Sequence, residues 1–253
     1  MAERDGYDPG TPSWVDLTTP DLEGALRFYG GLFGWEFEDA GEEAGHYHMA
    51  LVRGRRVAGL GSAQPGSPPV SYWTTYISGS DVEAHAVAIR EAGGTVAFGP
   101  MDVLGQGRMV IGTDPEGAMF GIWQPQAHPG AQVVSENATF SWCERITHDL
   151  EGTARVYGSV FGYAFEDLPD TPASVYQMFK VGDAPVGGIF AATEDVPPHW
   201  LTYFWLDDID AGFDRVRELG GELLREPVDS SYGRYAPVRD PQGAGFCLIR
   251  GTS

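Results

Sequence analysis

Cysteine and basic residues are scarce in this sequence, and each shortage excludes a class of protein. The 253 residues include two cysteines, Cys143 and Cys247, which lie too far apart in the chain for a CxxC zinc motif. Sixteen Lys and Arg stand against 36 Asp and Glu, which gives a net charge of −20. Because nucleic acids and anionic membranes attract basic surfaces, we expect neither of them as a partner.

Long apolar runs are also absent from the sequence. No run approaches the roughly 18 residues that a membrane-spanning helix needs, and residues 1–10 lack the apolar segment of a signal peptide. We therefore expect a cytoplasmic protein that is a monomer or a homodimer. The 35 Gly and 18 Pro favour short strands joined by many turns over a bundle of helices.

An internal repeat divides the chain into two halves. Residues 21–39 read DLEGALRFYGGLFGWEFED and residues 149–167 read DLEGTARVYGSVFGYAFED, so that 12 of the 19 aligned positions are identical. The similarity continues to the Asp-Pro-x-Gly segments that begin at Asp114 and Asp240. The repeat predicts four parts of the chain, namely a flexible N-terminus (1–10), a first domain (11–124), a connector (125–139) and a second domain (140–253).

Each half is predicted to contain two copies of one βαβββ module. Residues 14–19 alternate in the manner of a strand, residues 21–33 carry apolar side chains at helical spacing, and three short strands follow. The same order of elements restarts at Trp73, and the second half repeats both modules. The sequence therefore predicts an α+β fold of four βαβββ modules.

The repeated DLEG…FED segment and the two Asp-Pro-x-Gly turns resemble the vicinal oxygen chelate superfamily. This superfamily includes glyoxalase I, bleomycin-resistance proteins and extradiol dioxygenases. The resemblance covers residues 11–249 and implies that the modules pair into two tandem glyoxalase-like open barrels. It implies the fold more than the reaction, because members include isomerases, thiol transferases, dioxygenases and binding proteins.

The resemblance also implies where a metal ion would bind. Metal-dependent members carry ligands on the first and the last strand of each module. In this sequence the eight corresponding positions are Trp14, Trp73, Trp142, Trp200, Gly59, Gly121, Gly188 and Cys247. Indole and glycine supply no donor atom for a divalent cation, and one thiol is too few. We therefore expect no metal site and no other cofactor.

The four tryptophans at equivalent positions favour a site for a small molecule. Strand alternation predicts that Trp14 faces Trp73 across the first barrel, and that Trp142 faces Trp200 across the second. Thr75 and Thr202 would add a hydroxyl to each site. Two interpretations stay open, because the indoles either fill the barrels as core or clamp a planar hydrophobic ligand.

Asp16 and Glu144 are the candidate catalytic residues, since each lies two positions after a tryptophan on the same strand face. A carboxyl in an apolar barrel needs a partner such as an indole N–H or a tyrosine. Burial would also raise its pKa and suit it to acid–base chemistry or to binding a cation. His48 is included among the ligand-binding candidates, and the equivalent residue in the second half is Gln177.

Three functional hypotheses follow from these residues. The first is a metal-independent glyoxalase- or bleomycin-resistance-like protein that binds a hydrophobic or aromatic metabolite or antibiotic. The second is a metal-free isomerase, lyase or hydroxylase of secondary metabolism that uses Asp16 or Glu144 as acid or base. The third is a structural or regulatory protein whose barrels are filled by the indoles.

Overall fold

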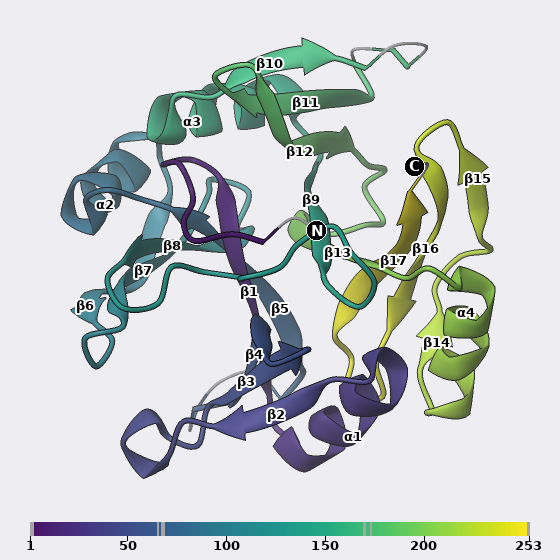
Figure 1. The fold of residues 1–253 in the computed structure, drawn as a ribbon. Coiled ribbons are helices and arrows are strands. Elements are labelled where there is room, and N and C mark those ends of the chain that lie inside the picture. Colours follow the sequence, from purple (N-terminus) through teal and green to yellow (C-terminus); the bar gives the residue numbers. More distant parts are fainter. Residues whose placement is uncertain (1–2, 65, 67–68, 169–170, 173, 252–253) are drawn as a thin grey trace.

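The computed structural model describes residues 3–64, 66, 69–168, 171–172 and 174–251, which form two large sheets, four α-helices and the short 3-10 helix η1 (Glu42–Ala44) (Figure 1). The first module consists of β1 (Pro12–Thr19), α1 (Leu22–Phe33), β2 (Glu36–Asp39), β3 (His48–Val52) and β4 (Arg55–Ser62). The second consists of β5 (Tyr72–Ser78), α2 (Val82–Glu91), β6 (Thr95–Asp102), β7 (Gly107–Thr113) and β8 (Met119–Pro125).

The second half repeats this order of elements. The third module consists of β9 (Phe140–Thr147), α3 (Leu150–Phe161), β10 (Ala164–Asp167), β11 (Tyr176–Val181) and β12 (Ala184–Ala191). The fourth consists of β13 (His199–Trp205), α4 (Ile209–Glu218), β14 (Glu222–Leu223), β15 (Val228–Ser230), β16 (Gly233–Arg239) and β17 (Gly245–Gly251). Two short strands, β14 and β15, thus stand where the second module has the single strand β6.

The sheet topology shows which modules pair. The first sheet has the strand order β2-β3-β4-β1-β5-β8-β7-β6, and the second has β10-β11-β12-β9-β13-β17-β16-β14 with β15 paired to β16. Antiparallel pairing of β1 with β5, and of β9 with β13, joins the modules of each half. Neither sheet closes, so the prediction of four βαβββ modules in two tandem open barrels is confirmed.

The helices begin and end at the residues that the repeat preserves. Asp21 accepts a hydrogen bond from the Gly24 N–H at 2.9 Å, and Asp149 does the same for Gly152 at 2.9 Å. These contacts satisfy backbone donors that a helix start leaves free. Gly34 ends α1 with φ 70°, in the left-handed region that glycine adopts at low cost.

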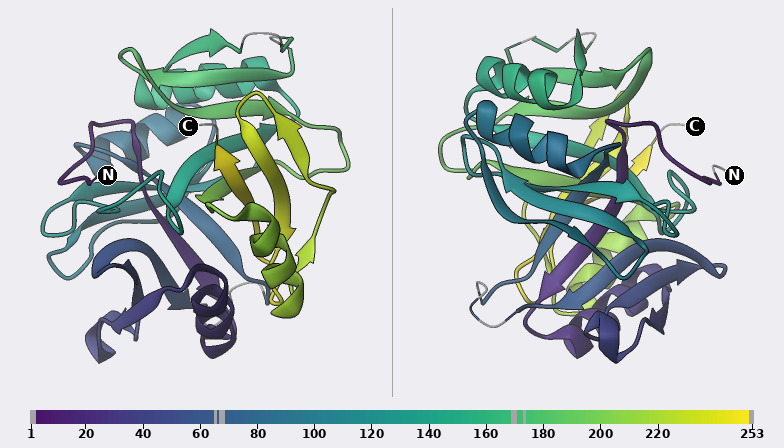
Figure 2. Two further views of the ribbon diagram at one scale, coloured as in Figure 1. Left: turned by 45° about the vertical axis from the view of Figure 1, so that its right-hand side comes forward. Right: turned by 90° about the vertical axis from the view of Figure 1, so that its left-hand side faces the viewer.

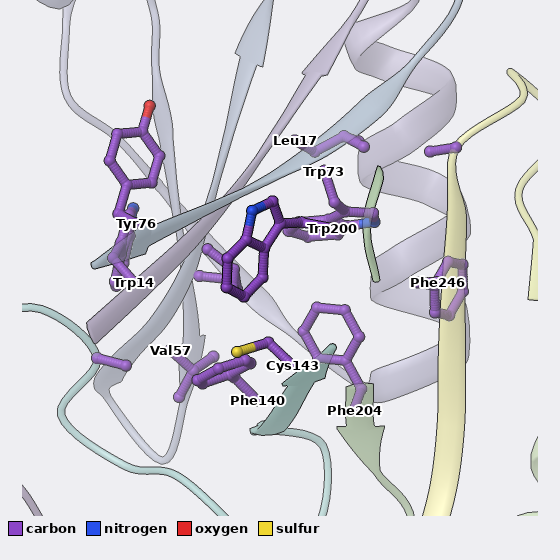
Figure 3. Close-up of a cluster of buried hydrophobic side chains, with 14 of the residues drawn as sticks. Trp14, Leu17, Val57, Trp73, Tyr76, Phe140, Cys143, Trp200, Phe204 and Phe246 are labelled. Atoms are coloured by element: carbon purple, nitrogen blue, oxygen red, sulfur yellow. The ribbon is translucent and has the colours of Figure 1, made fainter. Parts of the chain in front are cut away.

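The two halves pack through the helix-covered faces of their sheets. Helix α1 lies beside α4, and α2 lies beside α3 (Figures 1 and 2). At the centre, the hydroxyl oxygens of Thr75 and Thr202 are 3.3 Å apart. Figure 3 shows Trp73, Trp200 and Phe204 gathered in this buried region. The approximate two-fold symmetry of the repeat therefore places the core between the domains as well as within them.

The N-terminal segment makes hydrogen bonds with later parts of the chain over the residues that the structure describes, and its flexibility stays a prediction. The Arg4 N–H donates to the Gln132 carbonyl at 2.9 Å, and the Tyr7 hydroxyl donates to the Ala131 carbonyl at 2.5 Å. The Tyr163 hydroxyl donates to the Gly10 carbonyl at 2.5 Å. Residues 3–10 thus bind the connector and the second domain. Within the described residues, no helix has the length and apolar character that crossing a membrane requires.

Candidate functional site

Asp16 lies on the face of the first sheet that is opposite the helices. Its neighbour Leu17 pairs with Trp73, which packs on Tyr29 of α1, so alternation along β1 turns Trp14 and Asp16 the other way. In the sheet, Asp16 is the partner of Gly59 on β4, and Trp14 is the partner of Tyr76 on β5. We call this opposite side the helix-free face.

A hydrogen-bonded group of side chains surrounds Asp16 on this face. The Trp14 indole N–H donates to the Tyr47 hydroxyl at 3.1 Å, and that hydroxyl donates to the Asp16 carboxyl at 3.3 Å. Tyr76 also lies against Asp16. We call Trp14, Asp16, Tyr47 and Tyr76 the first carboxyl cluster. Asp16 and Tyr47 stay partly accessible to solvent, whereas only 5% of Trp14 is exposed.

The second domain contains the equivalent group. The Trp142 indole N–H donates to the Tyr176 hydroxyl at 3.2 Å, and the Tyr203 hydroxyl donates to the Glu144 carboxyl at 2.5 Å. We call these four residues the second carboxyl cluster. Because the duplication preserved an acid, two tyrosines and a tryptophan in one arrangement, the cluster is the best candidate for a shared function.

Both carboxyls hold their protons more tightly than usual. Burial raises the pKa of Asp16 from 3.8 to about 7, although hydrogen bonds from Tyr76, Tyr47 and Thr74 offset part of the rise. Burial likewise raises the pKa of Glu144 against the opposing hydrogen bonds from Tyr203 and Tyr176. Near neutral pH, Asp16 therefore exists both as the acid and as the carboxylate, so it can donate or accept a proton.

Comparison with protein families identifies the superfamily of both halves. The model described as "Glyoxalase/Bleomycin resistance protein/Dioxygenase superfamily" matches residues 11–122, and the one described as "Glyoxalase-like domain" matches residues 130–249. The chain belongs to this glyoxalase superfamily. The resemblance seen in the repeated segment is thereby confirmed in both halves.

Two of its relatives match this chain over nearly its whole length. "Putative glyoxylase CFP32" of Mycobacterium tuberculosis is 38% identical over 258 residues, which cover 99% of this chain and 98% of the relative. "Anthracycline biosynthesis protein DnrV" of Streptomyces peucetius is 35% identical over 263 residues, which cover 96% and 94%. The names of these relatives agree with a glyoxalase-like protein and with secondary metabolism.

Solved structures support the fold alone. The Mn(II)-bound glyoxalase from Novosphingobium aromaticivorans superposes with a TM-score of 0.66 at 17% identity, covering 96% of this chain and 82% of that one. The 2,3-dioxygenase LapB from Pseudomonas sp. KL28 has a TM-score of 0.67 at 13% identity, covering 97% and 94%. Glyoxalase superfamily enzymes of different chemistry therefore share this arrangement of strands.

The residues at the superfamily's metal positions do not fit a metal ion. A Cβ atom at Gly59 would lie 1.7 Å from the Tyr47 hydroxyl oxygen, and one at Gly188 would lie 2.0 Å from that of Tyr176. At Gly121, a Cβ atom would lie 2.2 Å from the ring of Tyr76. Tyrosine side chains thus take the space that ligand side chains would need at these positions.

The protonation states of the clusters also disfavour the binding of a metal ion. Burial, and then the nearby Asp16 charge, raise the pKa values of Tyr47 and Tyr76 well above 10, so both phenols keep their protons. Burial also raises the pKa of the Cys247 thiol, so no thiolate is available in the second domain. One carboxyl with neutral phenols is a poor ligand set for a divalent cation. The described residues contain no group of three or more potential metal ligands.

Trp73 and Trp200 do not belong to the clusters, so the expected facing pairs of tryptophans are wrong. The Trp73 indole N–H donates to the Tyr29 hydroxyl at 2.9 Å, and that of Trp200 donates to the Tyr157 hydroxyl at 2.9 Å. Figure 3 shows Trp14 beside Tyr76, apart from Trp73 and Trp200. Strand β5 is buried on both faces, and β13 is buried on one face and partly buried on the other, so the apolar pattern did not reveal which face the indoles occupy.

The two threonines and the histidine named from the sequence also lie elsewhere. Thr75 and Thr202 meet each other in the core between the domains and supply no hydroxyl to a cluster. The His48 ring bonds the carbonyl of His46 at 2.7 Å, at the start of β3. Among the described residues, no hydrogen bond joins His48 to the first carboxyl cluster, so its binding role stays a prediction.

The tyrosines of the clusters were missed by sequence reasoning. Tyr76 and Tyr203 follow Trp73 and Trp200 by three residues in both halves, and Tyr47 and Tyr176 occupy equivalent places before β3 and within β11. The sequence signal that could have revealed these tyrosines is their repetition at equivalent positions in the two halves. A surface groove of about 320 Å³ lies elsewhere, between the Asp114–Glu116 turn and α3.

Proposed function

We propose that each carboxyl cluster binds a small hydrophobic or aromatic metabolite without a metal ion. One observation carries this proposal, which is that both domains preserve an acid of raised pKa, two tyrosines and a tryptophan on the helix-free face. The acid and hydroxyls would fix the polar end of the ligand, while the aromatic rings would contact its apolar body.

The surroundings of the first carboxyl cluster support an apolar ligand. Trp14, Tyr76, Gly121, Ile111 and Phe98 are successive partners across the strands, which makes a row from the cluster to the edge of the sheet. Phe98, at the end of this row, is 54% exposed. An apolar row that begins at a carboxyl suits a molecule with one polar end.

The charge of the protein favours a cationic polar end. The chain carries a net charge of −20, which would raise the local concentration of cations. The relatives named for anthracycline biosynthesis are consistent with a role in the chemistry of aromatic secondary metabolites. We therefore expect a planar ligand with an ammonium group to bind more tightly than its uncharged analogue.

A second candidate function is a metal-free enzyme that uses Asp16 or Glu144 as a general acid or base. The observation that favours it is the pKa of Asp16, about 7, which is suited to proton transfer at neutral pH. Tyr47 would then hydrogen-bond the reacting group or hold the acid in place. Turnover of a bound metabolite that Asp16→Asn abolishes, with binding retained, would favour this enzyme.

Naphthalene and 1-naphthylmethylammonium provide a matched pair of probes for the binding proposal. We expect the ammonium probe to bind two sites per chain about 10-fold more tightly than naphthalene, because hydrogen bonds to charged groups contribute about 1.5–3 kcal/mol. Calorimetry would measure affinity and stoichiometry. Asp16→Asn together with Glu144→Gln should remove the preference and leave naphthalene binding unchanged.

Two outcomes would contradict the proposal. Neither probe binding saturably would exclude ligand sites in the clusters and leave the hypothesis of filled barrels. Equal affinity for both probes in the wild-type protein would exclude the carboxyls as ligand contacts. Elemental analysis tests the metal-independent part, since about one bound metal ion per domain in purified protein would overturn it.

A further inference from the structure

His128 is a buried imidazole that no hydrogen bond accounts for. It lies in the connector and is only 4% exposed. Neither of its ring nitrogens has a hydrogen-bond partner in the part of the chain that the structure describes. Leaving a buried donor or acceptor unpaired is destabilising, so such a group in a folded protein indicates a partner that is a water molecule or a ligand.

The ring of His128 lies against the first carboxyl cluster. It meets the Trp14 indole edge-on, with ring centroids 4.4 Å apart, and lies 5.7 Å from the ring centroid of Trp123. Trp123 lies two residues after Gly121 on β8 and pairs with Met109 on β7, so it is on the same face of the sheet as the apolar row described above. His128 is therefore adjacent to the indole whose N–H holds Tyr47 against Asp16.

The backbone of the connector fixes this position without using the imidazole. The His128 N–H donates to the Gln106 carbonyl at 2.9 Å, and the His128 carbonyl accepts from the Trp123 indole N–H at 2.8 Å. Further along, the Ala131 N–H donates to the Ser13 carbonyl at 2.8 Å. The main chain thus holds the ring against Trp14, and both ring nitrogens are buried without a hydrogen-bond partner among the described residues.

The imidazole is neutral at physiological pH. Burial first, and then the charge of Arg56, lower the pKa of His128 to about 4. A neutral imidazole has one N–H donor and one lone pair that accepts. Its natural partner is an oxygen that can accept or donate, such as a hydroxyl group.

The second carboxyl cluster has no equivalent of this histidine. Among the described residues, no aromatic ring or imidazole packs on Trp142 as His128 packs on Trp14. Trp142 is accordingly more accessible than Trp14. The duplication therefore produced two similar acid sites, of which only the first has the connector laid against it.

We propose that His128 is a ligand-recognition residue of the first carboxyl cluster, where its ring nitrogens hydrogen-bond a hydroxyl group of the bound metabolite. This inference rests on the proposed function, because it assumes that the cluster binds a small planar molecule. It deepens that function by distinguishing the two sites. The first cluster therefore prefers hydroxylated aromatic ligands more strongly than the second.

The test compares 1-naphthol with naphthalene in the wild-type protein and in His128→Phe. Phenylalanine retains an aromatic ring between Trp14 and Trp123 and removes both nitrogens. The indole ¹H–¹⁵N signals of Trp14 and Trp142, each assigned from its Phe variant, report binding at the two clusters separately. We expect 1-naphthol to bind the wild-type first cluster about 3- to 10-fold more tightly than naphthalene, as one net hydrogen bond allows.

In His128→Phe, this preference should fall at Trp14 to the smaller value measured at Trp142, which should itself stay unchanged. The melting temperature should stay equal or rise, because the substitution removes an unpaired buried polar group. A preserved preference for 1-naphthol at Trp14 would overturn the inference while leaving the proposed function intact. A large fall in melting temperature would also overturn it, because the nitrogens would then have structural partners. Failure of naphthalene to bind either cluster would instead contradict the proposed function itself.

Discussion

The two corners where the domains meet started as copies of each other and now differ in charge. At one corner, Asp240 of the second domain accepts a hydrogen bond from the Tyr29 hydroxyl of the first at 2.9 Å. At the other, Asp114 of the first domain accepts one from the Tyr157 hydroxyl of the second at 3.1 Å. Each tyrosine also accepts from a buried indole, so a Trp–Tyr–Asp chain crosses the interface twice.

Arg145 distinguishes the Asp114 corner from the Asp240 corner. Its side chain is fully buried and lies 2.6 Å from the Asp114 carboxyl and 2.8 Å from that of Glu116. The equivalent residue at the Asp240 corner is Leu17, and the equivalent of Glu116 is Gln242. The Trp–Tyr–Asp hydrogen bonds join the domains at both corners. The ion pair of Arg145 is an addition to them at the Asp114 corner.

Glu116 of the Asp114 corner is held in its charged form by its hydrogen-bond donors and by Arg145. Burial alone would raise its pKa, but hydrogen bonds from Thr147 and His148 and the charge of Arg145 together lower it. The carboxyl also accepts from Thr153 at 3.1 Å. A carboxylate with this many donors is costly to leave without its cation.

The largest effect is expected for Arg145→Ala. The substitution leaves Asp114 and Glu116 without their cation, so the free energy of unfolding should fall by about 3–5 kcal/mol. Urea denaturation measures this loss. A fall below about 1 kcal/mol would mean that the ion pair adds nothing to the Trp–Tyr–Asp chain.

The Asp240 corner of the same protein supplies the matched control for this prediction. Arg145→Leu combined with Glu116→Gln copies the Asp240 corner, because Leu17 and Gln242 occupy those places there. Replacing a buried ion pair by residues of suitable shape is often close to neutral. The double variant should therefore recover most of the stability that Arg145→Ala loses, and a double variant as unstable as Arg145→Ala would contradict the equivalence of the corners.

The carboxyl clusters, unlike the corners, should respond alike. The folded state raises the pKa of Asp16 from 3.8 to about 7, so it favours the protonated acid. Stability from this group is present below about pH 4 and is lost as pH rises through about 7. Asp16→Asn should therefore raise the free energy of unfolding at pH 8 by roughly 1–3 kcal/mol.

Urea denaturation between pH 4 and 8 would measure this difference. Asp16→Asn should show a flatter dependence on pH than the wild-type protein, and Glu144→Gln should change it in the same direction because burial also raises the pKa of Glu144. At pH 4 the variants should approach wild-type stability. A variant that is less stable than wild type at pH 8 would show that the carboxylate is the form the cluster stabilises.

The sequence predicted the modules well because the duplication repeats their helix caps and turns. Asp16 and Glu144 were placed on the correct face relative to Trp14 and Trp142, since the apolar residues Val15 and Leu17 mark the helix-covered side of β1. Strand β5 carries no such mark. It is buried on both faces, and this led to the wrong side for Trp73.

Other parts of the site depend on contacts that no local pattern encodes. Tyr47 reaches Asp16 because the pairing of β3 with β4 places its ring over Gly59 and Gly61, where no Cβ atom blocks it. His128 reaches Trp14 because the connector folds back along the first sheet. Both features follow from long-range packing, which the spacing of residues along the chain does not report.

The smallest effect is expected from removing the tyrosine hydroxyls of the two corners. Tyr29→Phe and Tyr157→Phe each take a donor from a buried Asp and an acceptor from a buried indole, so each should cost about 1–2 kcal/mol of unfolding free energy. Tyr29→Phe should cost more, by about 0.5–1 kcal/mol, because Asp114 keeps Arg145, whereas the donors left to Asp240 among the described residues are N–H groups of its own turn. Paired urea denaturation curves would resolve this difference. In an Arg145→Leu, Glu116→Gln background the two costs should become equal, and an unchanged gap there would show that Arg145 is not its cause.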